Sequence, residues 1–353
     1  MSAIAINGRF LTQRTTGVQR VAAEILRALD VLAGEGKAPP MRVIAPPGAD
    51  APWLQHISLQ RAGQGGGQFW EQRALPMAAR GAMLLNLGNT APILAGRAQA
   101  VVIHDAGAFD TPDSYSFAFR SWYRVLHRAL VLRGARIVTV SEFSRARLAH
   151  RLHLDPASIG VMAEGAEHIL REPADDSVLA RQGLKPGGYA LAVGTGAAHK
   201  NLGLLSAAAA HLQSQGMVVA AAGARDASVF AGAAGASAML ALGRVSDAEL
   251  RALYENAACL LFPSRYEGFG LPPLEAMACG CPVIAARAAS VPEVCGDAAL
   301  WFDPASPESL VAALQRLPAE ADRLRVAGLA RAEGFTWRRA ALTLLGLMEK
   351  GAR

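Results

Sequence analysis

The sequence predicts an α/β protein made of two Rossmann-like, doubly wound parallel-sheet domains that face a ligand cleft. Short apolar runs alternate with helical patterns along the chain, as expected for parallel strands joined by crossover helices. At 353 residues, the chain is too long for one compact core and long enough for two domains of ordinary size. Such folds bind ligands at the carboxyl ends of their strands, so candidate site residues are sought there.

The expected strands are short apolar runs, each followed by a polar or helical segment. In the first half they lie at 3–6, 42–45, 83–87, 101–104, 137–140 and 159–162. In the second half they lie at 189–193, 218–222, 259–262, 283–286 and 300–302. The stretch 60–68, which contains three consecutive glycines, predicts a mobile loop.

A polar segment at 164–188 separates the two sets of strands and shows no clear periodicity. We therefore expect a first domain at 1–170 and a second domain at 171–335. The apolar fraction of 52% and the charged fraction of 18% describe a globular protein. Every apolar run is shorter than the roughly 18 to 20 residues of a membrane span, and the first residues lack a signal-peptide core, so a cytoplasmic location is expected.

Cysteine usage gives no indication of a metal site. The spacing of Cys279 and Cys281 is too tight for the usual zinc pattern, and no second pair follows. Buried free thiols are expected instead, and no metal ligand is predicted.

Positive charge is concentrated at 120–151, where eight arginines face a single acid, Glu142. Arg120, Arg124 and Arg128 recur every four residues and have aromatic neighbours, which indicates one stripe of a helix. Two interpretations stay open: a peripheral contact with anionic lipid, or a solvated face whose aliphatic side packs into the domain. No nucleic-acid-binding motif accompanies the charge, so no nucleic-acid partner is expected.

The stretch 266–283 contains the most specific pattern, two glutamates eight positions apart. Glu267 lies in a glycine-rich loop, and Glu275 lies about one turn into a predicted helix. Glycines let backbone amides approach a ligand closely, the helix start supplies unpaired N–H groups, and carboxylates accept hydrogen bonds from vicinal hydroxyls. The simple alternative is that both acids complement the helix macrodipole.

Two strand ends in the first half carry candidate groups. Gly17 precedes a helical pattern, where a glycine would let a phosphate approach the helix start; a plain strand-to-helix turn is the alternative. His104 and Asp105 close an apolar strand with groups that can hydrogen-bond a sugar, or that serve the fold alone. Ser141 predicts a helix cap.

In the second half, Gly194-Thr195-Gly196 follows a strand but lacks the third glycine of the dinucleotide fingerprint. A nicotinamide site is therefore not expected. Lys200 can instead neutralise a diphosphate. Further on, Arg244 and Val245 could present backbone groups to a base, whereas Ser246 could simply cap the next helix.

These motifs, in this order, resemble glycosyltransferase family 4, whose members are retaining enzymes of the GT-B fold. The resemblance runs over nearly the whole chain. The segments that carry it are Gly17, His104, 199–201, 243–245, 267–275, 69–72 with 75–76, 290–294, 302–304 and 335–337.

The resemblance implies a role for each matching residue in binding a nucleotide sugar. Glu275 would bind the ribose hydroxyls, Glu267 a hydroxyl of the donor sugar, and Lys200 the diphosphate. The residues expected to help with the diphosphate are Gly17 and the amides of Phe269, Gly270 and Leu271. His104 would contact the sugar near the reacting carbon, Arg244 and Val245 would lie beside the base, and a helix at 336–353 would cross back onto the first domain.

One departure from the family concerns the charge beside the diphosphate. Many relatives carry an arginine where this chain has Thr195 or His199. We hypothesise that His199 supplies part of that charge, which would make donor binding sensitive to pH between about 6 and 7. The segments 7–10 and 16–20 resemble a mannosyl-transferring branch, so GDP-mannose is the leading donor and a UDP-sugar the next.

The resemblance also implies the chemistry and the partners. The first domain, 1–170, would bind the acceptor, and the second, 171–335, the nucleotide sugar. The acceptor hydroxyl, from a glycan or lipid-linked glycan, would attack on the face from which the nucleoside diphosphate leaves. Neither a metal nor a cofactor is expected, and the sequence contains no Asp-x-Asp pair. Two other classes stay open: a sugar-nucleotide epimerase or phosphorylase of the same fold, and a noncatalytic sugar-nucleotide-binding protein.

Overall fold

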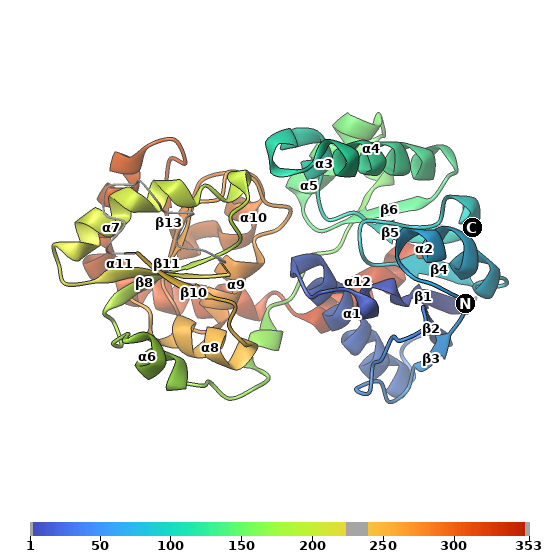
Figure 1. Ribbon diagram of the computed structural model, residues 1–353, viewed down its shortest axis with the longest axis horizontal. Coiled ribbons are helices and arrows are strands. Elements are labelled where there is room, and N and C mark those ends of the chain that lie inside the picture. The colour runs from blue at the N-terminus through green and yellow to red at the C-terminus, as the bar shows by residue number, and fades with distance from the viewer. Residues whose placement is uncertain (1–2, 224–238, 350–353) are drawn as a thin grey trace. The chain divides into compact units, whose positions relative to one another are not determined.

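The computed structural model describes residues 3–223 and 239–349. The chain divides into two compact units. The first combines Met1–Gly165 with Trp337–Arg353, and the second is Ala166–Thr336. The first unit ends inside the polar segment at 164–188. Both units are layered α/β structures in which helices cover a central sheet (Figure 1).

The first unit contains a seven-stranded sheet in the order β3-β2-β1-β4-β5-β6-β7, with all pairs parallel. Its strands are β1 (Ile4–Asn7), β2 (Met41–Ala45), β3 (Ser58–Arg61), β4 (Met83–Asn86), β5 (Gln99–Val102), β6 (Arg136–Thr139) and β7 (Gly160–Val161). The order reverses between β1 and β4, which is the doubly wound arrangement.

The helices of the first unit present apolar stripes to this sheet. They are α1 (Gly17–Gly34), α2 (Gly67–Ala78), α3 (Gly107–Asp110), α4 (Phe117–Leu132), α5 (Glu142–Leu152) and α12 (Trp337–Glu349). In α1, Val21, Ile25 and Leu29 recur every four residues and are fully or almost fully buried. Helix α12 packs against α1 (Figure 1), so the end of the chain completes the first unit.

The second unit repeats the plan with six parallel strands in the order β10-β9-β8-β11-β12-β13. The strands are β8 (Tyr189–Val193), β9 (Val218–Ala222), β10 (Met239–Gly243), β11 (Cys259–Phe262), β12 (Val283–Ala286) and β13 (Ala299–Phe302). The helices are α6 (Ser177–Gln182), α7 (Leu205–Gln213), α8 (Asp247–Asn256), α9 (Leu271–Ala278), α10 (Val291–Cys295) and α11 (Pro307–Glu333). Two parallel-sheet domains confirm the predicted fold class.

Two strands were not predicted, and each has a physical reason. Strand β3 is an edge strand whose residues are mostly exposed, so it lacks the apolar run that marks a buried strand. The predicted loop at 60–68 is therefore wrong at both ends, because Gln60 and Arg61 belong to β3 and Gly67 begins α2. Strand β10 is only half-buried along most of its length, and its sequence did not stand out from the alanine-rich stretch around it.

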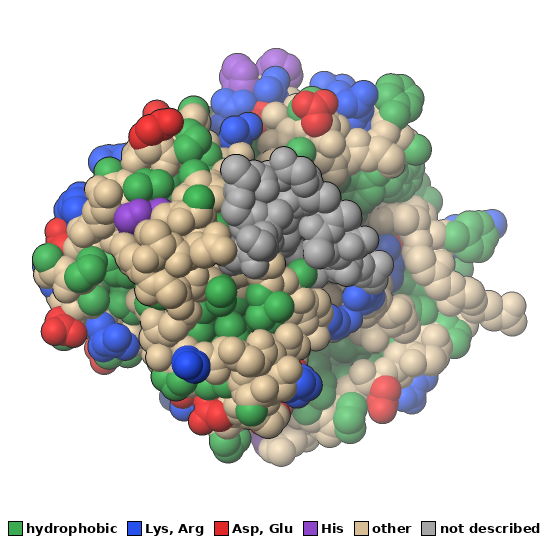
Figure 2. Space-filling view, turned by 60° about the vertical axis from the view of Figure 1, so that its left-hand side comes forward, with side chains coloured by type: hydrophobic (Ala, Val, Ile, Leu, Met, Phe, Trp, Pro, Cys, Tyr) green, Lys and Arg blue, Asp and Glu red, His purple; other side chains and the backbone are tan. Residues whose placement is uncertain are grey.

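Two surface properties bear on partners. Among the described residues, no helix is both long and apolar enough to cross a bilayer. On the face that Figure 2 shows, acidic and basic side chains are interspersed.

Candidate functional site

Lys200 and Glu267 form an ion pair at the carboxyl edge of the second sheet. The Nζ atom of Lys200 donates to Oε1 of Glu267 at 2.7 Å, and the side chains are 18% and 12% exposed. Lys200 ends the short helix that follows β8, and Glu267 lies in the loop after β11. These strands are neighbours at the point where the strand order reverses, which is where doubly wound folds bind ligands.

The loop that carries Lys200 is held by its neighbour Asn201. This residue adopts a left-handed conformation with φ of 55°, which asparagine tolerates better than most residues. Its amide donates to the carbonyls of Pro263 and Pro304, at 3.2 and 3.0 Å, and so ties the loop to the ends of β11 and β13. The Lys200 stem passes close to Gly194, 3.7 Å from where a Cβ on that glycine would be, which is ordinary van der Waals contact.

Ser290 holds the loop that carries Glu267. Its buried hydroxyl contacts the backbone carbonyls of Glu267 and Phe269 at 2.9 and 2.7 Å. Sequence reasoning noted the segment 290–294 but gave Ser290 no role. A serine in the loop after an apolar strand is a weak signal, and the carbonyls that it contacts lie more than twenty positions away in sequence.

The glycine-rich turn after Glu267 leads directly into α9. Gly270 has φ of 115°, in the left-handed region that favours glycine, and Leu271 begins the helix. Phe269 is buried and packs edge-on against Phe335. The backbone amides of these three residues therefore belong to a fixed turn at a helix start, where N–H groups lack intrahelical partners.

Glu275 is buried and hydrogen-bonded through both carboxylate oxygens. Its Oε1 lies 2.9 Å from Nε2 of His168, and its Oε2 accepts from the Tyr254 hydroxyl at 3.0 Å. Burial and the nearby Glu275 carboxylate raise the pKa of Tyr254 well above its usual value, so this hydroxyl stays protonated as a donor. The first turn of α9 contains no acidic residue, so macrodipole complementation does not account for Glu275. Sequence reasoning missed His168 because nothing local connects it to Glu275.

The other predicted residues of the second unit lie in loops at the same sheet edge. Arg244 is exposed and Val245 half-buried, between β10 and α8. Ser246 caps α8 in a capping box with Glu249, as the simple alternative predicted. The half-buried His199 accepts a hydrogen bond from the Arg265 amide through its own carbonyl at 2.8 Å, so its backbone is fixed.

In the first unit, His104 is fully engaged. Its Nδ1 lies 3.3 Å from Oε1 of Glu164, and its Nε2 lies 3.0 Å from the Leu87 carbonyl. Burial disfavours the charged imidazole, but Glu164, the Leu87 carbonyl and Asp105 outweigh it and raise the pKa of His104. A doubly protonated ring satisfies both acceptors.

Gly17 and Ser141 both begin helices. Gly17 is the first residue of α1 and is exposed, with no atom within 4 Å of where a Cβ would be. Ser141 caps α5 through the amide of Ser144 at 3.0 Å, as predicted. The open space around Gly17 leaves its backbone accessible to a ligand.

The basic stripe on α4 is partly bonded to the segment that precedes the helix. Arg124 donates to the Ala108 and Phe109 carbonyls at 2.8 and 3.3 Å, and Arg120 donates to the Pro112 carbonyl at 3.4 Å. These two arginines therefore fix α4 to the preceding segment, whereas Arg128 is exposed and the aliphatic Leu126 and Leu130 pack into the domain, as the second interpretation expected. The exposed side of α4 carries apolar residues: Trp122 is 36%, Val125 58% and Leu132 85% exposed.

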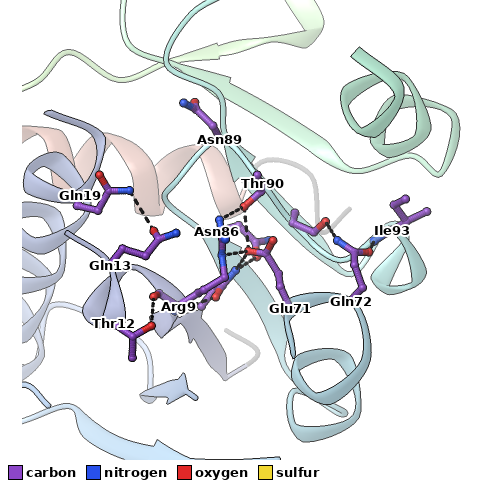
Figure 3. Close-up of polar contacts among 12 residues, drawn as sticks. Arg9, Thr12, Gln13, Gln19, Glu71, Gln72, Asn86, Asn89, Thr90 and Ile93 are labelled. Carbon is purple, nitrogen blue, oxygen red and sulfur yellow. Dashed lines mark hydrogen bonds and ion pairs between the residues drawn. The ribbon is translucent and has the colours of Figure 1, made fainter. Parts of the chain in front are cut away.

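A buried polar network lies beneath the carboxyl edge of the first sheet (Figure 3). The Arg9 guanidinium contacts Oε1 of Glu71 at 3.1 Å and Oγ1 of Thr90 at 2.7 Å. The Asn7 amide donates to the same Glu71 oxygen at 2.7 Å and to Oδ1 of Asn86 at 2.9 Å. Burial raises the pKa of Glu71, against the opposing effect of Arg9 and these donors. The positive charge of Arg9 is thus paired with the Glu71 carboxylate of the same unit.

Part of the chain is similar in sequence to known glycosyltransferases. Residues 180–327, all within the second unit, match the family model described as glycosyl transferases group 1. The chain is 35% identical over 258 residues to O-antigen chain mannosyltransferase B of Escherichia coli. The aligned region covers 66% of this chain and 65% of the relative. It is 28% identical over 248 residues to O-antigen chain mannosyltransferase RfbU of Salmonella typhimurium, covering 65% and 63%. The chain thus matches less than two thirds of the length of either relative.

Solved structures give the same fold over the whole chain. Sucrose-phosphate synthase from Thermosynechococcus elongatus superposes with a TM-score of 0.74 at 18% identity and covers 99% of both chains. WaaG, described as a glycosyltransferase involved in lipopolysaccharide biosynthesis, superposes with a TM-score of 0.67 at 17% identity, covering 99% and 98%. The two-sheet architecture is therefore the GT-B fold. Residues 180–327 match the group 1 glycosyltransferases, which supports the class that the motifs predicted.

Proposed function

We propose that the protein is a retaining glycosyltransferase that moves a sugar from a nucleoside diphosphate sugar to a hydroxyl of a glycan or lipid-linked glycan, in cell-surface polysaccharide synthesis. The observation that carries the proposal is the Lys200–Glu267 ion pair at the switch point of the second sheet. GDP-mannose is the leading donor, because the segments 7–10 and 16–20 resemble mannosyl-transferring enzymes and the two relatives above are named mannosyltransferases.

Lys200 and the turn before α9 supply the charge that a departing diphosphate needs. The ammonium and the amides of Phe269, Gly270 and Leu271 would stabilise the negative charge that grows as the diphosphate leaves. Glu267, already paired with Lys200 at 2.7 Å, would accept a hydrogen bond from the donor sugar. The pair therefore links the two halves of the donor, diphosphate and sugar.

Glu275 would bind the ribose through acceptor positions that its two partners leave. A carboxylate has about four lone-pair sites, and His168 and Tyr254 occupy one on each oxygen. These partners would fix the orientation of the carboxylate before the nucleotide arrives. Arg244 and Val245 would lie beside the base, in the loop after β10.

Three roles implied by the resemblance stay predictions. Gly17 would let a phosphate approach the start of α1, where the space for a Cβ is open. His104 would lie near the reacting carbon, with its ring held by Glu164 and Leu87. His199 would make donor affinity depend on pH between about 6 and 7, and a flat affinity in a His199→Asn variant would support that role.

The proposed reaction needs neither a metal nor a cofactor. Lys200 would take the part of a cation at the diphosphate, and a departing phosphate oxygen would accept the proton of the attacking hydroxyl. Chelation with EDTA should therefore leave the transfer rate unchanged. A rate that falls on chelation and returns with added Mg²⁺ would remove this part of the proposal.

A screen of nucleoside diphosphates tests the donor. We expect GDP to raise the melting temperature more than UDP or ADP, because the nucleotide whose base fits the site binds most tightly. A ligand at one hundred times its Kd stabilises the folded state by about 2.7 kcal/mol. Release of GDP from GDP-mannose only when acceptor is added would separate a transferase from an epimerase. Binding of nucleotide sugars without any turnover would instead indicate a binding protein.

We also propose that the first unit touches an anionic membrane surface through the apolar side of α4. Trp122, Val125 and Leu132 project from one side of this helix and are well exposed, and Arg128 and Arg133 are exposed beside them. Apolar side chains flanked by cations suit the boundary between headgroups and acyl chains. A lipid-linked acceptor would be presented at such a surface.

Sedimentation with vesicles of phosphatidylglycerol and phosphatidylcholine tests this contact. Replacing Trp122, Val125 and Leu132 together by serine should abolish co-sedimentation. Val326→Ser is the matched control, because Val326 is 70% exposed on α11 of the other unit. Equal sedimentation of the triple variant and the control would contradict the contact.

A further inference from the structure

The first unit has a surface cavity of about 500 Å³ between α2 and the short helix η2 (Ile93–Ala95). Ala82 and Ala98, which line it, directly precede β4 and β5, so the cavity lies at the amino edge of the first sheet. His104, by contrast, follows β5 at the carboxyl edge. The cavity is therefore separate from the site proposed for sugar transfer, and no role proposed above uses a residue that lines it.

Most of the lining is apolar and offers little to a hydroxyl-rich ligand. It includes the buried Ala79 and Leu84 and the half-buried Pro76. Gln72 is the one uncharged polar side chain among the described lining residues, and the backbone already engages its amide (Figure 3). Its Nε2 donates to the Ala91 carbonyl and its Oε1 accepts from the Ile93 amide, both at 3.0 Å. A sugar would find few hydrogen-bonding partners here.

The charged part of the lining is entirely positive. Arg73 and Arg80 line the cavity and are exposed, and no acidic side chain joins them among the described lining residues. Within the part of the chain that the structure describes, neither guanidinium has a hydrogen bond or an ion pair, and Arg73 lies over the Phe69 ring at 5.2 Å. Guanidinium groups match the geometry of phosphate oxygens, so the two arginines favour a phosphate.

Apolar side chains alternate with these cations around the cavity. Phe69, Arg73 and Met77 recur every four positions and form one stripe of α2, and Arg80 follows three positions later. Phe69 is 65% and Met77 61% exposed, and Leu94 of η2, which lines the cavity, is 73% exposed. A surface of this kind suits a ligand whose anionic group is joined to an apolar chain.

The turn after η2 lies beside the turn after α4. A Cβ added at Gly96 would be 3.7 Å from the Arg133 carbonyl, and a Cβ added at Gly134 would meet the Arg97 side chain. Arg97 and Arg133 are both exposed. The basic and apolar surface therefore continues from the cavity to the end of α4, the helix proposed above to touch an anionic membrane. Phospholipid is the amphipathic phosphate that such a surface would meet.

We propose that this cavity binds the phosphate group of an anionic phospholipid. Arg73 and Arg80 would bond to the phosphate oxygens, and Met77 and Leu94 would pack against the first carbons of the acyl chains. This is a site for a single headgroup, in addition to the apolar contact proposed for α4. It rests neither on transfer nor on that contact, because a soluble short-chain lipid measures it without turnover and without a membrane.

Isothermal titration calorimetry on the full chain tests the binding. The probe is dihexanoyl phosphatidylglycerol below its critical micelle concentration. Dihexanoyl phosphatidylcholine has the same chains but carries its own cation, and glycerol 3-phosphate has the phosphate without chains. We expect phosphatidylglycerol to bind at least about fivefold more tightly than either, because only this probe offers both an uncompensated anionic group and apolar carbons.

Arg73→Gln and Arg80→Gln should each weaken the binding of phosphatidylglycerol at least about fivefold, since hydrogen bonds between charged groups are the strong ones. Arg128→Gln is the matched control. It removes the same charge from an exposed position on α4 of the same unit, and Arg128 does not line the cavity. All three side chains are exposed, so the melting temperature should stay unchanged in each variant.

Several outcomes would overturn the proposal. They are no binding of dihexanoyl phosphatidylglycerol, equal affinity for either comparison probe, and equal losses in the Arg80 and Arg128 variants. The last would show that the positive surface attracts the lipid without a defined site.

The same probe separates this inference from the proposed function. The triple serine variant of α4 should bind dihexanoyl phosphatidylglycerol as the wild type does. Binding that depends on Arg80, in a protein whose triple variant still sediments with vesicles, would uphold the cavity and contradict the α4 contact. The same binding in a protein that turns over none of the nucleotide sugars would uphold the cavity and refute the transferase.

Discussion

Lys200 and Glu267 lie 67 positions apart in sequence and meet through a 2.7 Å ion pair. Each follows one of two neighbouring parallel strands, β8 and β11, whose carboxyl ends share one edge of the sheet. The pair forms only because the second unit is doubly wound, and it places a cation and a carboxylate where such folds bind ligands.

Removing either partner should stop transfer without unfolding the protein. Lys200→Ala and Glu267→Ala are each expected to lower kcat by at least about a hundredfold, because both groups act on charge that develops in the transition state. The double variant should be little worse than either single variant, since the residues act as a unit. Initial-rate kinetics check this, with melting temperature as the control for folding. Near-normal turnover in either single variant would contradict the assignment.

Ser290 should act on the donor through the position of the Glu267 loop. Ser290→Ala leaves one buried and one partly buried carbonyl without their shared donor, so we expect a loss of about 1 to 3 kcal/mol in stability and a higher KM for donor. Ser206→Ala is the control, because the Ser206 hydroxyl makes one contact with a carbonyl at 3.0 Å on an exposed surface. Equal effects of the two substitutions on donor KM would exclude the positioning role.

Two glycines should respond differently to the same substitution. Gly270→Ala places a side chain at a φ of 115°, and we expect it to destabilise the protein by about 1 to 2 kcal/mol. Gly17→Ala adds its methyl group to open space, so stability should be unchanged while donor affinity falls if a phosphate lies there. Calorimetric melting and donor titration separate the two effects. A stable Gly270 variant with full donor affinity would contradict the role given to this turn.

The His104–Glu164 contact predicts a pH dependence of stability. The pKa of His104 is raised above its usual 6.5 in the folded state, so its contribution is fully present below about pH 6.5 and lost as the pH rises through the folded pKa. The stability difference between wild type and Glu164→Gln should therefore be largest near pH 6 and shrink toward pH 9. Melting temperatures across this range check it, with the exposed Glu142→Gln as control. A difference that stays constant would refute a charged His104.

The fold and one half of the site were predictable from local sequence. Apolar runs predict parallel strands, and parallel strands bring their following loops to one edge, which is why Lys200 and Glu267 were expected in one site. The edge strand β3 escaped prediction because its exposed residues lack an apolar run.

The contacts of His168 and Ser290 could not be read from the sequence. His168 contacts Glu275 across 107 positions of the sequence, and Ser290 contacts Phe269 across 21. No periodic pattern in a sequence predicts such pairs. The backbone contacts of α4 could not be predicted either. Arg120 and Arg124 bond to backbone carbonyls, a role that their regular spacing does not distinguish from a solvated stripe.

The most direct test of the account is the transfer of mannose from GDP-mannose in the presence of EDTA, followed by NMR of the product anomer. We predict GDP release that depends on an added glycan acceptor, and a product that keeps the α configuration of the donor. A β-linked product, or no acceptor-dependent release from GDP-, UDP- or ADP-sugars, would contradict the account.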